Sequence, residues 1–221
     1  MSEWEIIWQQ KDTFISGFGT TLALFVIASI AGLVIGVSLL YAMENTNNKV
    51  KAVLSLWVNI MRTLPFLILA YLLYYGLPQL GLRMEALTVG FISLSLYHGA
   101  YFCEIFRGQR QGMANGLIEA GQACGFSRHK IFSRIILPSV VLKSIPLIAN
   151  QLIICLKDTA FLSIITVLDV TAAANSVQSM YFIPVKAFVI AIALYWVISI
   201  AIERVSQYSS KHIEKRGLSH A

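Results

Sequence analysis

The uncharged stretch LALFVIASIAGLVIGVSLL, residues 22–40, decides the fold class of this chain. A helix needs roughly 20 apolar residues to cross about 30 Å of hydrocarbon, and no charged side chain occurs from Thr13 to Met43. The chain of 221 residues is 57% hydrophobic and 13% charged, with a mean hydropathy of +0.71, whereas soluble domains carry about 25% charged residues. The sequence therefore predicts an all-α membrane protein without a separate soluble domain of ordinary size.

Apolar segments on either side of this stretch predict about five membrane-spanning helices within a single transmembrane domain, residues 1–221. The second segment contains Arg62 and Pro65, and the fourth contains Lys157–Asp158, so these two are less uniform than the others. Residues 166–184 are too polar to span, and a short re-entrant or surface helix is expected there. The expected spans are residues 18–42, 53–76, 87–107, 140–167 and 186–204.

Basic side chains are distributed unevenly between the expected spans, and this asymmetry predicts the orientation of the chain. Lys and Arg concentrate in segments 44–52, 107–143 and 203–221, whereas the opposite connections hold few of them. Because Lys and Arg accumulate on the cytoplasmic side of a membrane, we expect the N-terminus outside, the C-terminus inside, and a long cytoplasmic loop at residues 107–143. The same rule explains the formal net charge of +6, so nucleic acid is not expected as a partner.

Within that loop, residues 116–138 (GLIEAGQACGFSRHKIFSRIILP) have the pattern of a folded helical hairpin. Leu117–Cys124 has a helix-forming composition, Gly125 is placed to end this helix, and Ser127 can cap the next one. Apolar residues at 131, 132, 135 and 136 recur at helical spacing. The alternative is a helix that lies on the lipid surface, but Leu117–Cys124 lacks the basic face of such helices.

These residues resemble the EAA loop of bacterial ABC-importer permeases, in which EAA is followed by three residues, a glycine, nine residues and I-x-L-P. Gly121 replaces the second alanine of that pattern, which is expected to soften the helix by up to about 1 kcal/mol. The resemblance implies the type I importer transmembrane fold, with a coupling helix at about residues 116–127 that docks into a cytoplasmic ATPase. Within the coupling loop, residues 112–138, it assigns ATPase coupling to Gly116, Glu119, Ala120, Gly121, Gly125, Leu137 and Pro138.

Further motifs are similar to those of the polar amino acid permeases of the histidine, arginine, glutamate and glutamine type. They include residues 62–65 (RTLP), 104–108 (EIFRG) and 157–159 (KDT). The family usually has R-G-T-P at the first motif and K-D-T-S at the third, where this chain has Ala160. The resemblance implies a multi-pass permease of the bacterial inner membrane that moves polar amino acids.

Ionisable side chains at membrane depth are costly, and they indicate either a solute path or a buried pair. Glu104 lies three residues from both Tyr101 and Arg107, so the three can share a helix face. Either Glu104 pairs with Arg107, or it faces a water-filled cavity and attracts a cationic group of the solute. Arg62 precedes Pro65, which breaks a helix, so Arg62 or a freed carbonyl can receive a solute carboxylate; a gate or a structural role is the alternative.

Asp158 and Thr159 offer oxygen acceptors in the fourth span, and permeases that resemble this chain use this region near the central path. The alternative is an interhelical pair, such as Lys157 with Glu104, that only holds the bundle together. Acidic groups favour a cationic or zwitterionic amino acid as the solute. The candidate path residues are Arg62, Tyr101, Glu104, Asp158 and Thr159.

The sequence contains no motif for nucleotide hydrolysis or metal binding. A GxxxxGK[ST] phosphate loop, an HExxH motif and paired-cysteine zinc spacing are all missing. Cys103, Cys124 and Cys155 are expected to be small buried residues, and His98 an interior histidine with no proton-relay role. The chain is therefore expected to be non-catalytic, with no cofactor or metal of its own.

The resemblance also implies partners. ATP and Mg would be bound by a dimer of ABC ATPase subunits, and a working importer would add a second permease subunit, identical or related, and a periplasmic or surface solute-binding protein. Two rival functions remain open at this stage. An ion-driven secondary amino acid transporter would need internal repeats, of which none is convincing here, and a membrane interaction or assembly protein would perform no transport.

Overall fold

The computed structural model describes residues 2–215, and all regular structure among them is helical. The end of the basic segment 203–221, residues 216–221, lies outside the described part. Contacts divide the chain into two compact units, which are described separately below. The first unit comprises the residues up to Ile30, Leu64–Ser95 and Leu152–Ile202, and the second comprises Ala31–Thr63, Leu96–Gln151 and the residues from Glu203 onward.

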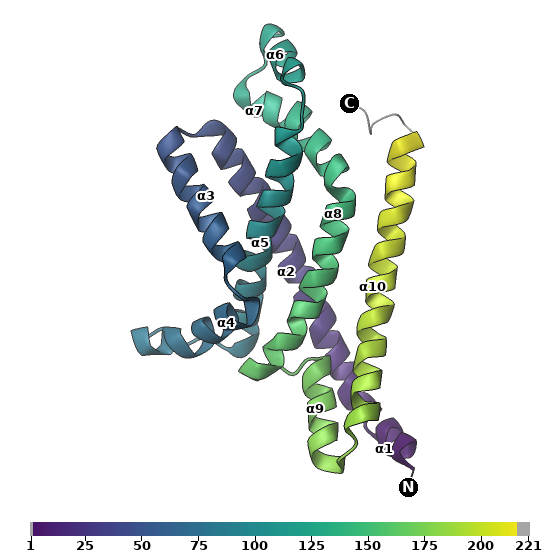
Figure 1. The fold of residues 1–221 in the computed structure, drawn as a ribbon. Helices are drawn as coiled ribbons and strands as arrows, with labels where there is room; N and C mark the ends of the chain where they lie inside the picture. The colour runs from purple at the N-terminus through teal and green to yellow at the C-terminus, as the bar shows by residue number, and fades with distance from the viewer. Residues whose placement is uncertain (1, 216–221) are drawn as a thin grey trace. The chain divides into compact units, whose positions relative to one another are not determined.

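Figure 1 shows the helices in chain order. The α-helices are α1 (Glu3–Gln9), α2 (Lys11–Asn45), α3 (Asn48–Thr63), α4 (Phe66–Tyr71), α5 (Ala86–Gln111), α6 (Asn115–Ala123), α7 (Arg128–Ile131), α8 (Leu137–Asp158), α9 (Val170–Tyr181) and α10 (Pro184–Lys215). Two π-helical turns, η1 (Leu72–Gly76) and η3 (Phe132–Ile136), and two 3-10 turns, η2 (Leu77–Leu80) and η4 (Thr159–Ile165), connect them.

Among residues 2–215, four helical segments are long and apolar enough to cross a membrane: Lys11–Asn45, Ala86–Gln111, Arg128–Ile165 and Pro184–His212. A fifth span exists only if the bent pair Asn48–Thr63 and Phe66–Leu80 counts as one. The fold is thus the expected all-α membrane architecture, but the helices overrun the apolar segments from which the spans were predicted. The helical segment that contains most of the fourth predicted span begins at Arg128, because the helix of the loop continues into the span without a break.

The second predicted span, residues 53–76, is broken at Pro65. Helix α3 ends at Thr63, Pro65 is extended with φ −65° and ψ 131°, and α4 begins at Phe66. Proline has no N–H to donate and clashes with the preceding helical turn, and the residue before it avoids the helical region. The break therefore leaves carbonyl groups at the end of α3 without helical partners.

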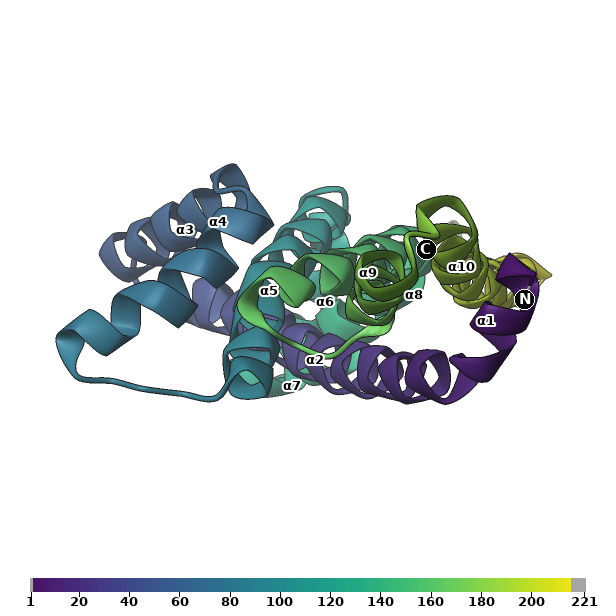
Figure 2. The same cartoon turned by 90° about the horizontal axis from the view of Figure 1, so that it is seen from below.

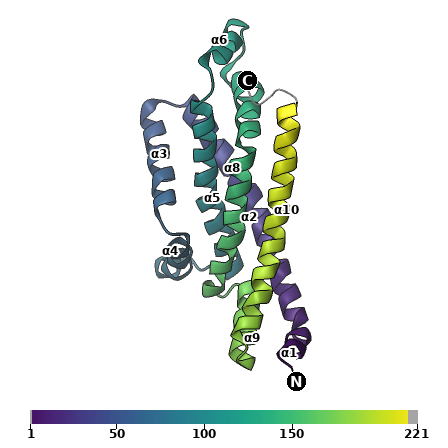
Figure 3. The same cartoon turned by 45° about the vertical axis from the view of Figure 1, so that its right-hand side comes forward.

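The first unit has a core in which α9 packs against α2 and α10. Its buried side chains are small or aromatic: Phe14, Val170, Ala173, Ala174, Val177, Ala187 and Ala191. Figure 3 shows α9 beside the lower part of α10, and Figure 2 shows α1 beside the first turns of α10, where Lys186 Nζ lies 2.9 Å from Glu3 Oε2. The helix expected within residues 166–184 is confirmed as α9.

The second unit joins the C-terminal half of α2 to α5 through glycines. A Cβ atom on Gly36 would lie 2.7 Å from Phe102 Cβ and 2.9 Å from the backbone nitrogen of Cys103. Such distances show that the two backbones approach each other as closely as only glycine permits. Met43, Val58, Ala100 and Cys103 complete a small buried cluster beside this contact.

Candidate functional site

The helical hairpin predicted at residues 116–138 is present, and α6 forms its first arm. The helix ends at Ala123, and Gly125 follows with φ +72°, a left-handed conformation that glycine adopts without strain. Ser127 Oγ then accepts the backbone N–H of Lys130 at 3.4 Å and caps α7. Both local predictions, the Gly125 stop and the Ser127 cap, are confirmed. Figures 1 and 3 show α6 beyond the ends of α5 and α8.

One face of α6 is packed and the other is open. Gly121 is buried, and a Cβ atom there would lie 2.7 Å from Ile135 Cδ1, so the glycine that departs from the EAA pattern lets α6 lie against η3. Gly116, Glu119 and Ala120 are exposed. Leu117 is also exposed (41%) although it is apolar. Cys124 is exposed as well, so the prediction that it is buried is wrong: it follows the last turn of α6, on the open side of the hairpin.

The I-x-L-P motif forms the joint between the hairpin and α8. Ile131 to Leu137 contains the π-helical turn η3, in which the N–H of Leu137 donates to the carbonyl of Phe132 five residues back. Pro138 follows directly, and its ring is incompatible with a regular helical bond to the preceding turn. A π-helical turn placed before a proline accommodates that conflict, and such turns occur frequently at functional sites.

A polar pocket lies beneath α6, and the sequence reasoning missed it. Its volume is about 290 Å³, and Glu44, Arg110, Gln122 and Arg128 are among its lining residues. Arg110 Nε donates to Glu44 Oε2 at 3.1 Å and so ties α5 to α2. The available signal was Glu44 itself, the first charge after the long uncharged run.

Arg62, Tyr101, Glu104 and Arg107, all in the second unit, form one cluster. Arg107 donates from Nε to Glu104 Oε2 at 2.9 Å and from Nη2 to Oε1 at 2.6 Å. Arg62 Nη1 lies 3.5 Å from the same carboxylate, and its guanidinium carbon is 5.6 Å from the centre of the Tyr101 ring. The Tyr101 hydroxyl donates to the backbone carbonyl of Arg62 at 3.1 Å. The carbonyl freed by Pro65 is therefore satisfied by Tyr101.

This cluster shows how Glu104 is paired. Its carboxylate is held by two arginines, so the Glu104–Arg107 pair is present and the alternative partner Lys157 is not needed. Two guanidiniums against one carboxylate leave one positive charge uncompensated. Arg62 Nε is buried and makes no hydrogen bond within the described residues, so the cluster is better suited to an anionic group than Glu104 alone suggested.

Asp158 and Thr159 lie in the first unit, where α8 ends and η4 begins. Asp158 is partly buried, Lys157 is exposed, and Thr159 is fully buried. The Thr159 hydroxyl donates to the carbonyl of Leu156 at 2.7 Å. The change from α-helix to 3-10 turn thus falls inside the KDT motif, which the sequence reasoning treated as the middle of a continuous span.

The remaining sequence expectations concern His98 and metal ligands. His98 is fully buried, and its Nδ1 lies 2.8 Å from the side-chain nitrogen of Gln151, as expected for an interior histidine. Cys103 and Cys155 are buried as predicted. In the described part of the chain, no group of three or more His, Cys, Asp or Glu side chains is arranged to hold a metal ion.

Asp169 is a buried carboxylate that the sequence reasoning did not single out. It is fully buried at the N-terminus of α9, accepts the N–H of Ala172 at 2.8 Å and the Tyr195 hydroxyl at 3.2 Å, and lies outside the candidate spans. Burial raises the pKa of the Asp169 carboxyl above its usual range, and these hydrogen bonds oppose the rise. An Asp before a run of small residues is an N-cap signal that was available in the sequence.

Comparisons with known proteins find transport permeases along nearly the whole chain. Residues 28–215 match the family model "Binding-protein-dependent transport system inner membrane component". A putative glutamine transport system permease protein of Rickettsia bellii is 31% identical, with 96% of this chain and 99% of that protein covered. The arginine ABC transporter permease protein ArtQ of Escherichia coli is 30% identical, with 91% and 93% covered. A probable glutamine ABC transporter permease protein of Bacillus subtilis is 27% identical, with 95% and 97% covered.

Solved structures agree on the fold. A crystal structure of an amino acid ABC transporter with histidines superposes with a TM-score of 0.85 at 27% identity, covering 96% of this chain and 99% of that one. An inward-facing structure of the MetNI methionine ABC transporter has a TM-score of 0.74 at 21% identity, covering 95% and 99%.

Proposed function

Since the chain belongs to the family of inner membrane components of binding-protein-dependent transport systems, we propose that it is a permease subunit that imports polar amino acids across the bacterial inner membrane. Subunits of this family are non-catalytic, and a separate ATPase subunit hydrolyses ATP. The three relatives reported above are named as permease proteins for glutamine or arginine. The hypotheses of an ion-driven transporter and of an assembly protein are set aside, because the family match covers residues 28–215.

The observation that carries this proposal furthest is the open face of α6. Glu119, Ala120 and Leu117 are exposed there, while Gly121 anchors the opposite face on Ile135. An exposed helix with an unpartnered apolar residue, held rigidly from behind, is suited to docking. The proposed partner is a dimer of ABC ATPase subunits, which binds ATP and Mg on the cytoplasmic side, together with a second permease subunit and an external solute-binding protein.

The loop transmits movement from the ATPase to the membrane helices in this proposal. Gly116, Glu119 and Ala120 contact the ATPase, Gly121 and Gly125 fix the geometry of α6, and Leu137–Pro138 connect it to α8. Changes in the ATPase on binding and hydrolysing ATP then tilt α5 and α8. The N-terminus is outside and the C-terminus inside, in accordance with the distribution of basic residues.

The arginine cluster suggests how an amino acid is recognised. Its one uncompensated positive charge suits the α-carboxylate, which a guanidinium binds through paired hydrogen bonds, and Arg62 is the candidate ligand. Glu104 moderates that charge, and Tyr101 holds the backbone beside Arg62. Asp158 is a separate candidate for contact with cationic groups of the solute, while Thr159 positions the end of α8 through its bond to Leu156.

Coupling is tested by replacing Gly125 with alanine in the complex reconstituted into liposomes. A side chain in the left-handed region costs about 1–2 kcal/mol, so the end of α6 should shift and uptake per ATP hydrolysed should fall. Gly108→Ala is the matched control, because a Cβ atom at Gly108 meets nothing within 4 Å and its φ is ordinary. Glu119→Ala should likewise weaken copurification of the ATPase. The docking assignment is contradicted if uptake per ATP is unchanged in Gly125→Ala and copurification of the ATPase is unchanged in Glu119→Ala.

The solute assignment is tested with Asp158→Asn. We expect uptake of cationic amino acids to fall more than uptake of neutral ones, since only the cations lose an opposite charge. Glu85→Gln, at an exposed glutamate outside the cluster and the loop, is the control. Equal loss for every solute, or no loss, excludes direct contact by Asp158.

A further inference from the structure

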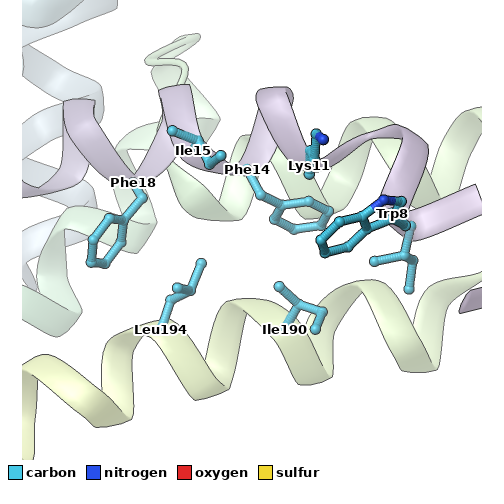
Figure 4. Close-up of a pocket in the computed structure, with 8 residues that line it drawn as sticks. Trp8, Lys11, Phe14, Ile15, Phe18, Ile190 and Leu194 are labelled. Carbon is cyan, nitrogen blue, oxygen red and sulfur yellow. The ribbon is translucent and has the colours of Figure 1, made fainter.

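An apolar groove opens between the start of α2 and the first turns of α10, entirely within the first unit (Figure 4). Its volume is about 230 Å³. Side chains from α1, α2 and α10 line it, and Figure 4 shows Phe18 and Leu194 at one end and Trp8 with Lys11 at the other. Its apolar lining includes Ile7, Trp8, Phe14, Phe18, Ile190 and Leu194.

The groove is unsuited to a polar solute. Apart from Lys11 its lining side chains are apolar, and an amino acid buried there would lose hydrogen bonds to water without replacement. An apolar groove of this volume can hold part of a hydrocarbon chain.

The surroundings of the groove point to lipid. Both α2 and α10 are candidate membrane spans. Ile15, which lines the groove, is 65% exposed, and Ile192 on α10, outside the lining, is 66% exposed. Atoms lining an unfilled groove lack dispersion contacts on one side. An acyl chain from the surrounding bilayer would restore those contacts for α2 and α10 together.

Lys11 and Trp8 mark the level of the lipid headgroups. Lys11 is the last basic residue before the uncharged run, and its Nζ lies 4.9 Å from the centre of the Trp8 ring. Tryptophan prefers the membrane interface, and lysine extends its ammonium toward the headgroups. Lys186 at this end pairs with Glu3, whereas Lys11 forms no ion pair with a carboxylate among residues 2–215.

From these observations we infer that the groove binds one acyl chain of a membrane phospholipid, whose phosphate is held by Lys11. The bound lipid fills the space between the α1–α2 segment and α10 and stabilises their packing. The residues that line this site include none of the candidate path or coupling residues, and the inference does not depend on the proposed transport function.

The test uses the full chain, copurified with its partner subunits, and native mass spectrometry to count bound lipids. Phosphatidylglycerol is compared with a diacylglycerol that has the same acyl chains and no phosphate. Leu194→Trp fills the groove and should reduce retained phosphatidylglycerol at least about tenfold. Ile192→Trp adds the same side chain to the exposed face of α10 and should retain the lipid as the wild type does.

Lys11→Gln tests the phosphate contact separately, and because Lys11 is exposed this variant folds even if Leu194→Trp does not. It should bring retention of phosphatidylglycerol down to that of diacylglycerol. Equal lipid counts in wild type, Leu194→Trp and Lys11→Gln overturn the proposal. A concentration-dependent dimer that Leu194→Trp abolishes without changing the lipid count also overturns it, because a second copy of the chain then occupies the groove.

Discussion

Replacing Glu104 with glutamine removes the only carboxylate from the arginine cluster and keeps its shape. Glutamine retains one acceptor oxygen, so one of the two charge-assisted hydrogen bonds from Arg107, at 2.9 and 2.6 Å, is lost together with the 3.5 Å ion pair to Arg62. A hydrogen bond to a charged group contributes about 1.5–3 kcal/mol. The Arg62 and Arg107 side chains are 34% and 37% exposed, so screening by water reduces the expected loss to about 1–2 kcal/mol.

The same change raises the charge of the cluster by one unit, and this alters solute selection. At about 7 Å and an effective dielectric of about 20, one unit charge contributes about 2 kcal/mol. We therefore expect the uptake ratio of cationic to neutral amino acids to fall by up to roughly thirty-fold. The assay is competitive uptake into liposomes that contain the whole complex, with thermal unfolding of the same samples as the stability measurement.

Glu44→Gln supplies the matched control. Glu44 is as exposed as Glu104, at 24%, and pairs with a single arginine, Arg110, at 3.1 Å. The Glu44→Gln variant should lose some stability and keep the solute preference of the wild type. If Glu104→Gln leaves the uptake ratio unchanged, or if Glu44→Gln shifts it equally, the assignment of the cluster to the solute path is wrong.

Three further outcomes follow from the packing. Gly36→Ala should destabilise the chain by about 1–3 kcal/mol through overpacking against Phe102. Gly19 lies in the same helix, α2, and a Cβ atom there would meet nothing within 4 Å. Gly19→Ala should therefore be neutral or stabilising in thermal unfolding. Burial raises the pKa of the Asp169 carboxyl, so the folded state favours its protonated form. The stability gained from this protonation is present at low pH and is lost as the pH rises through the raised pKa. Asp169→Asn should abolish this pH dependence, measured as melting temperature against pH. Tyr101→Phe should cost about 1 kcal/mol by leaving a carbonyl at the end of α3 unpaired, seen as a lower melting temperature without a change in solute preference.

Local sequence signals predicted the coupling hairpin well because its geometry is set by single residues. Gly125 adopts the positive φ that ends α6, and Ser127 caps α7. Gly121 was read as a weak point from helix propensity alone, yet its reason is tertiary: Ile135 occupies the space of its missing side chain. Helix propensity describes only the helix itself, and the contact between Gly121 and Ile135 could be found only from the fold.

Side-chain contacts between residues distant in the sequence were the hardest feature to predict. The spacing of Glu104 and Arg107 predicted their pair, because residues three apart meet on a helix, but Arg62 joins them from another helix. The short α1 was missed although Ser2 and Glu5 form a capping box, because the reasoning followed hydropathy there. The helices also extend beyond the predicted spans, since an α-helix can continue past the hydrocarbon into the loops.

The π-helical turn η3 has a consequence for stiffness. A regular helix resists bending because every N–H is bonded four residues back, but at this joint Leu137 reaches back five residues and Pro138 donates no N–H at all. The root of α8 is therefore the most compliant point between α6 and the membrane. In the proposed coupling, a force on α6 would therefore turn α8 first at this joint, and Pro146 inside α8 gives the helix a second point where a regular hydrogen bond is missing.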